Sequence, residues 1–199
     1  MREAFAEKSL SYVSKYNNYT EIEKIKIKYG LESLYTIVTK TFGILLISLF
    51  LNIFKETLFL MLFYGSLRLF SHGIHASKSS YCWIASILCY VLFPLLIKYF
   101  VINKSAIICC WALSFICFIL WAPADTPKKP LVNKKKRIFD KVITILISLT
   151  LLFISIISKN DFINNCIFFS QIMAIISVNP LTYKLFKIPF NNYKTYKFN

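Results

Sequence analysis

The sequence predicts an all-α integral membrane protein with about six transmembrane or re-entrant helices and an amphipathic interfacial helix at its N-terminus. Hydrophobic residues make up 57% of the 199 residues, charged residues only 17%, and the mean hydropathy is +0.58. Soluble domains carry about 45–50% apolar and about 25% charged residues, so this composition favours a bilayer. The charge is strongly basic, with 24 Lys and Arg against 9 Asp and Glu. Because the basic residues alternate with apolar runs, they indicate loops facing anionic lipid and no nucleic-acid partner.

The first 32 residues predict an amphipathic segment at the cytoplasmic membrane surface. Phe5, Tyr12, Val13 and Tyr16 recur near helical spacing, and a second apolar stretch, 22–29, is interleaved with lysines. Aromatic and lysine side chains in this arrangement suit a helix lying among lipid headgroups. The alternative is a solvated leader helix. A cleaved signal peptide is not expected, because the segment has no apolar core.

Six apolar runs follow in the interval 33–178, which is predicted to hold the membrane helices. Most are short but reach the length of about 17 residues that a spanning helix needs. The second run is the shortest and has Arg68 near its end, so it either spans or is re-entrant and packed against protein. The runs are Leu34–Phe54, Thr57–Phe70, Tyr81–Ile97, Ser105–Trp121, Val142–Ser158 and Phe162–Val178.

The distribution of basic residues predicts that both termini are cytoplasmic. With the N-terminus inside, the cytoplasmic segments hold 19 Lys and Arg and the outer turns hold four. Such an excess marks the cytoplasmic side of a membrane protein. Residues 179–199 would then form a basic cytoplasmic tail. No repeat or boundary divides the sequence, so we expect one domain, residues 1–199.

A proline-rich basic interval, Ala122–Lys141, is predicted to be a cytoplasmic loop. Its prolines keep the first part out of a helix, because proline lacks the backbone donor and restricts the preceding residue. The basic cluster Lys134–Arg137, beside the fifth run, is explained by orientation alone. The stiff stretch that carries Lys128 and Lys129 is not.

Both histidines of the chain, His72 and His75, lie in a short stretch just ahead of Cys82. A nearby imidazole can take the thiol proton and generate the thiolate that a cysteine nucleophile needs. On one straight helix His75 and Cys82 would lie about 10 Å apart along the axis, so the segment must fold back, as Gly73 permits.

A serine cap at position 79 or 80 would place Cys82 in the first turn of the next helix, where the helix dipole stabilises a thiolate. The alternative is a pair of interfacial histidines beside a lipid-facing or palmitoylated cysteine.

Other chemistries lack their signatures. HExxH and GxSxG are absent, and no Asp or Glu lies in the middle of an apolar run, as an intramembrane aspartyl protease or a proton-coupled transporter would need. Zinc would need a further ligand beside the two histidines and the thiol, and the spacing of Asp125 does not support that role. The other five cysteines show neither CxxC nor metal spacing. No metal or cofactor is predicted.

The stretch around the histidines resembles the AgrB proteins of Gram-positive quorum sensing. The proline-lysine loop matches as well, and so do the length of about 200 residues, the six apolar runs and the basic N-terminal segment. The family often has a second glycine where His72 stands, so His72 either assists, fills space or competes as a base. The shared motif, RxxxxGxHAxxxxxC, is carried by Arg68, Gly73, His75, Ala76 and Cys82.

The resemblance implies a cysteine endopeptidase of the cell membrane, with a Cys-His dyad and no cofactor. Cys82 would attack an AgrD-like precursor peptide, with His75 as general base and then acid. The C-terminal tail would depart, and the acyl-thioester on Cys82 would cyclise to a thiolactone or lactone. Lys128 and Lys129 are candidates for gripping an acidic tail, and Arg68 for positioning a carboxylate or bracing the fold. Membrane lipids surround such a protein, and a homodimer is a candidate assembly.

Two functions from other classes stay open at this point. A peptide exporter would keep its function in Cys82→Ser. A non-catalytic membrane adaptor would bind a partner through its basic loops and carry lipidated cysteines. Neither explains why both histidines stand just ahead of Cys82.

Overall fold

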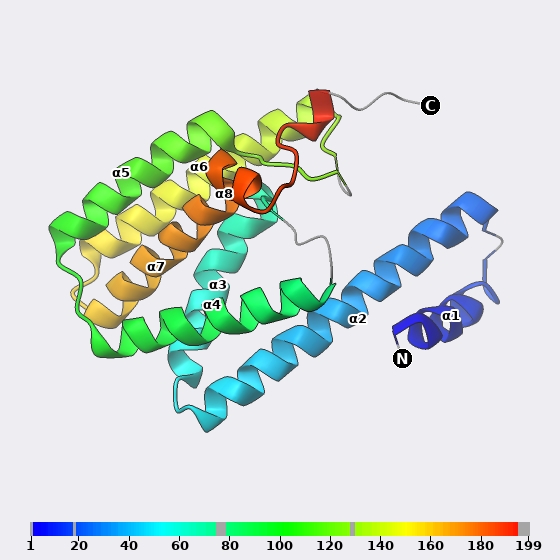
Figure 1. Cartoon of the computed structure of the whole chain (residues 1–199), viewed down its shortest axis with the longest axis horizontal. Coiled ribbons are helices and arrows are strands. Elements are labelled where there is room, and N and C mark those ends of the chain that lie inside the picture. The colour runs from blue at the N-terminus through cyan, green and yellow to red at the C-terminus, as the bar shows by residue number, and fades with distance from the viewer. Residues whose placement is uncertain (1, 18, 75–78, 128–129, 195–199) are drawn as a thin grey trace. The chain divides into compact units, whose positions relative to one another are not determined.

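The computed structural model describes residues 2–17, 19–74, 79–127 and 130–194, which form helices joined by short connections (Figure 1). In this part of the chain there are eight α-helices, a final 3-10 turn and no strand, and five helices are long and apolar enough to cross a membrane. The predicted all-α membrane class is confirmed. The chain forms two compact units, residues 1–51 and 52–199.

The first unit contains α1 and α2, and the second contains the remaining helices. Their bounds are α1 Arg2–Val13, α2 Glu21–Phe50, α3 Phe54–Ser71, α4 Ser79–Tyr99, α5 Lys104–Trp121, α6 Lys134–Ile157, α7 Asp161–Val178, α8 Pro180–Leu185 and the 3-10 turn η1 Asn192–Lys194.

Helix α2 joins the second amphipathic stretch and the first apolar run into one continuous helix. Its start is fixed by a capping box, in which the Glu23 N–H donates to Thr20 Oγ1 (3.4 Å) and the Thr20 N–H donates to Glu23 Oε2 (2.9 Å). Helix α1 packs against α2 through an ion pair of Glu7 with Lys28 (2.8 Å). The Lys28 ammonium holds the pKa of the Glu7 carboxyl below its usual range.

The second unit buries polar side chains and exposes large apolar ones, as a lipid-facing helix bundle does. Helix α6 shows this arrangement along its whole length. Its outward face carries Phe139, Leu146, Phe153 and Ile157, all exposed, and its inward face carries Asp140, Thr144, Ser148, Leu151 and Ser155, all buried.

Helix α7 is the central helix of the second unit and packs against α3, α4, α5 and α6 (Figure 1). In its first turns the Asn165 side chain donates to the carbonyl oxygens of Ile97 (3.3 Å) and Phe100 and accepts from the Ile102 N–H (3.1 Å). These contacts tie the α4–α5 connection to α7. The last turn of α7, at Ser177, therefore lies at the other end of the bundle, where α3 and α5 end.

One boundary differs from the sequence prediction, and one predicted membrane run stays open. The predicted Ala122–Lys141 loop ends at Asn133, because Asn133 Oδ1 caps α6 by accepting from the N–H groups of Lys135 (3.0 Å) and Lys136 (3.2 Å). The lysine cluster thus forms the first turn of a helix. Helix α3, which covers the second apolar run, is not among the five helices that meet the length and composition of a span. Whether it spans or is re-entrant stays a prediction.

Candidate functional site

Ser71, the last residue of α3, and the three residues after it form a segment, 71–74, that is held by two other parts of the second unit. The Gly73 N–H donates to the Ala124 carbonyl (2.8 Å) and the Ala124 N–H donates to the Ser71 carbonyl (3.0 Å), which makes a parallel bridge between His72 and Ala124. The Ile74 N–H donates to the Ser177 carbonyl at the end of α7 (2.8 Å). The backbone immediately ahead of His75 is therefore pinned to the loop after α5 and to α7.

Arg68, in the last turn of α3, braces the same segment. Its guanidinium donates from Nη1 to the His72 carbonyl and from Nη2 to the Ile74 carbonyl. The planar fork of arginine suits two acceptors at once, and a lysine ammonium would not match both in the same way. Of the two roles predicted for Arg68, the geometry favours bracing.

Gly73 lies at the centre of these contacts. Its φ is +111°, a conformation that side-chain-bearing residues rarely adopt. A Cβ atom here would overlap the Arg68 side chain and the Ser177 carbonyl, whose carbon would lie 2.9 Å away. Both the backbone angle and the lack of space require glycine.

His72 also has a positive φ, of 53°, and its side chain reaches α6. His72 Nε2 lies 3.0 Å from Asp140 Oδ2, and the Asp140 side chain is only 5% exposed. A protonated Nε2 can donate to this carboxylate. Asp140 is not among the site residues predicted from the sequence. The available signal was a lone acidic residue inside the basic stretch KKKRIFDK.

A second buried carboxylate, Asp125, organises the proline-lysine loop. Asp125 Oδ2 accepts from the N–H groups of Leu131 (3.3 Å) and Tyr193 (2.8 Å), and Oδ1 accepts from the Asn192 N–H (2.9 Å). This carboxylate joins the two ends of the loop and holds the C-terminal segment against the loop. Asp125 thus has a structural role, and no group of three His, Cys, Asp or Glu that could hold a metal occurs in the described residues.

Cys82 lies in the first turn of a helix, as predicted, but the predicted serine cap is wrong, because Ser79 and Ser80 are themselves the first two residues of that helix. Helix α4 begins at Ser79, so Cys82 is its fourth residue, and it is half-buried. The amino end of a helix carries partial positive charge that favours a thiolate. His75, Lys128 and Lys129 lie outside the described residues, and the pairing of His75 with Cys82 stays a prediction.

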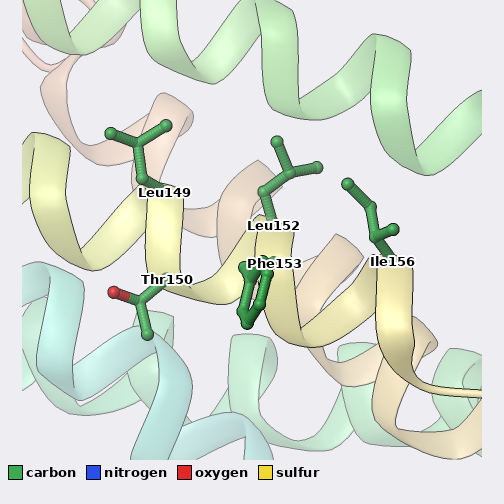
Figure 2. Close-up of a pocket in the computed structure, with 5 residues that line it drawn as sticks. All are labelled: Leu149, Thr150, Leu152, Phe153 and Ile156. Atoms are coloured by element: carbon green, nitrogen blue, oxygen red, sulfur yellow. The ribbon is translucent and has the colours of Figure 1, made fainter.

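A shallow apolar depression lies away from these residues, on the outer side of α6 (Figure 2). It is lined by Leu149, Thr150, Leu152, Phe153 and Ile156, and holds no titratable side chain. The Thr150 hydroxyl donates to the Leu146 carbonyl of its own helix (2.9 Å). The depression offers hydrocarbon contact and no catalytic group, so it is not the candidate site.

Known proteins match this chain over most of its length. The profile of the family AgrB, accessory gene regulator B, matches residues 6–178. An AgrB-like protein of Clostridium acetobutylicum is 33% identical over 172 residues, which is 86% of this chain and 82% of that protein. Accessory gene regulator protein B of Staphylococcus aureus is 35% identical over 153 residues, covering 76% of this chain and 80% of that protein. No solved structure matches the chain.

Proposed function

The chain belongs to the AgrB family of accessory gene regulator proteins, and on this basis we propose that it is a membrane cysteine endopeptidase with Cys82 as its nucleophile. Family membership and the five apolar helices make it a membrane protein with a role in quorum sensing. The observation that carries the peptidase proposal is local. Cys82 lies in the first turn of α4, and the braced segment 71–74 leads directly toward His75.

The proposed reaction begins with His75 taking the proton of the Cys82 thiol. The thiolate sulfur attacks a peptide carbonyl of an AgrD-like precursor, and the tetrahedral intermediate collapses with cleavage of the C–N bond. The protonated His75 returns its proton to the leaving amine, so the C-terminal tail departs with a free amino group. The rest of the precursor stays on Cys82 as an acyl-thioester.

Ring closure follows from the reactivity of this thioester. A thiol within the bound peptide attacks the acyl carbon, the Cys82 sulfur leaves, and a thiolactone forms; a hydroxyl nucleophile would give a lactone. Exchange between two thiols roughly conserves the free energy of the thioester. Making a thioester from an amide is uphill, so departure of the tail must drive the first step.

The basic loop has the complementary role of holding the tail. In the proposed complex Lys128 and Lys129 contact an acidic tail, and Arg68 keeps the segment before His75 in place. The hydrogen bonds of the Asp125 carboxylate support this role, because they hold the loop on both sides of the stretch that carries the lysine pair. A loop held in one conformation can present its charged groups to a bound peptide at fixed positions.

The experiment is co-expression of the protein with a short open reading frame encoded alongside it, followed by mass spectrometry of the processed peptide. Cys82→Ala and His75→Ala should each abolish cleavage while the protein stays in the membrane at its normal level. Joint replacement of the other five cysteines by alanine should leave substantial activity. Cleavage by the Cys82→Ala variant would exclude the peptidase and leave the exporter or the adaptor.

A further inference from the structure

The contact between His72 and Asp140 is unusual among those that hold the 71–74 segment, because it depends on two side chains. The parallel bridge, the Ser177 contact and the Arg68 brace all end on backbone atoms of the segment. They would form with many residues at position 72. The contact with Asp140, at 3.0 Å, forms only if the side chain at 72 can donate.

Each partner is in an energetically unfavourable state, and the contact between them offsets this. The Asp140 carboxylate is 5% exposed, and a buried carboxylate is strongly unfavourable unless it is paired. His72 has a φ of 53°, which glycine adopts freely and histidine does not. The pair therefore holds a strained backbone in place and satisfies a buried charge at once.

The position of the pair relates it to the proposed chemistry. His72 is three residues before His75, and Asp140 lies in α6, which no backbone contact of the 71–74 segment reaches. The segment is thus pinned to the loop after α5, to α7 and, through this pair, to α6. Such a third anchor limits rotation of the chain as it enters His75.

We propose that His72 and Asp140 form a positioning pair, which sets the direction of the backbone leading to His75 without contacting the substrate. The proposal rests on the peptidase function proposed above. It also assigns a role to His72, which is neither a filler nor a second base.

The test compares His72→Gly, Asp140→Leu and the double variant in purified protein reconstituted into vesicles. The substrate is a synthetic peptide with the sequence of the neighbouring precursor. Asp140→Leu should lower kcat per folded protein about tenfold, with KM nearly unchanged. Without its partner, His72 can leave the strained backbone conformation, and the backbone before His75 is then no longer held in one direction. Strain of the size stored at such backbone positions corresponds to roughly a tenfold change in rate. The double variant should recover most of kcat, since glycine adopts the positive φ without an anchor and leucine leaves no buried charge.

A merely structural role predicts a different pattern. Loss of activity would then follow the fraction of folded protein, measured by thermal unfolding, and kcat per folded protein would not change. The matched control is Ser155→Ala, which removes another buried hydrogen bond of α6, from Ser155 Oγ to Asn164 Oδ1 (3.0 Å), at the far end of the helix. It should leave kcat per folded protein unchanged.

Two results would overturn the proposal: an unchanged kcat in Asp140→Leu, or a double variant as slow as Asp140→Leu. If Asp140→Leu does not fold, Asp140→Ala, which removes the acceptor without adding bulk, takes its place with the same expected loss. Failure of the peptidase function itself is seen separately in the same vesicles, either as no cleavage by the parent protein or as unchanged cleavage by Cys82→Ala.

Discussion

His72 and Gly73 are consecutive residues with positive φ, and they turn the chain out of α3 into the segment that leads to His75. Such conformations persist in a folded protein only where surrounding contacts over-determine them. Here the contacts come from Arg68, from the Ala124 and Ser177 carbonyls and from Asp140. Strain held by this many contacts is typical of a functional site, and the proposed base, His75, is the next residue in the sequence after this segment.

Gly73→Ala should destabilise the second unit and impair processing. The added methyl group meets the Ser177 carbonyl and the Arg68 side chain at a φ of +111°. Overpacking of this kind costs about 1–3 kcal/mol, so thermal unfolding in detergent should show a lower midpoint. Precursor cleavage should fall further than the folded fraction, because the displaced backbone leads to His75.

The matched control for this change is Gly65→Ala, in the middle of α3. A Cβ atom at Gly65 meets nothing within 4 Å, and the residue is helical. Alanine is favoured over glycine in a helix by about 0.5–1 kcal/mol, so this variant should be as stable as the parent or more so. Equal behaviour of the two alanine variants would refute the account of Gly73.

At the scale of elements, Asp125 joins the proline-lysine loop to the C-terminal segment. Asp125→Ala should free the N–H groups of Leu131, Asn192 and Tyr193. Hydrogen bonds to a charged group contribute about 1.5–3 kcal/mol, so hydrogen exchange at these amides should accelerate roughly ten- to a hundredfold. Mass spectrometry of the peptides that cover residues 130–133 and 190–194 measures this change.

Asp161→Ala is the control for this exchange experiment. Asp161 is an exposed acid in the first turn of α7, and α7 begins far from the loop. Its removal should leave exchange at Leu131, Asn192 and Tyr193 unchanged. Unaltered exchange in Asp125→Ala would show that the loop and the tail are held by other contacts.

The lysine pair of the same loop is expected to act by charge. Lys128→Ala together with Lys129→Ala should slow precursor processing several-fold to about tenfold, since each exposed ionic contact contributes about 0.2–1 kcal/mol. Raised salt should have a similar effect on the parent protein, because exposed charges are screened. The rate of tail release, measured with a synthetic precursor, reports both effects.

The control for the lysine pair is Lys134→Ala with Lys135→Ala. These two residues are also lysines and are exposed, but they belong to the first turn of α6. Their removal should not slow processing so long as the orientation of the protein is kept. If the loop variant processes the precursor normally, Lys128 and Lys129 do no more than set topology.

The helices were predictable to different degrees for local reasons. The apolar runs identify the membrane helices because composition alone determines which stretches can lie in lipid. The starts of α2 and α6 depend on single capping residues, Thr20 and Asn133, whose signal is weak beside the apolar pattern. The hydrogen bonds of Gly73 with Ala124 and of Ile74 with Ser177 join residues about 50 and 100 positions apart, and no local pattern encodes such contacts.

At the scale of the whole molecule, the excess of basic residues predicts that both termini and the 122–133 loop are cytoplasmic. Reporter fusions after residue 133 and at the C-terminus should show cytoplasmic activity, because positively charged segments are retained on that side. Fusions in the α4–α5 connection, near Asn103, should report the outside. Cytoplasmic activity at Asn103 together with external activity after residue 133 would invert the arrangement and place the basic loop away from a cytoplasmic precursor.

The most direct measurement of the central claim is detection of the acyl-thioester on Cys82. A synthetic precursor whose ring-forming nucleophile is replaced by alanine can be cleaved but cannot cyclise, so the intermediate should accumulate in the vesicles. Mass spectrometry of the digested protein should find the truncated peptide attached to Cys82 and released by hydroxylamine. The adduct should be absent in Cys82→Ala. Tail release by the parent protein with no adduct, continuing unchanged in Cys82→Ala, would contradict the account.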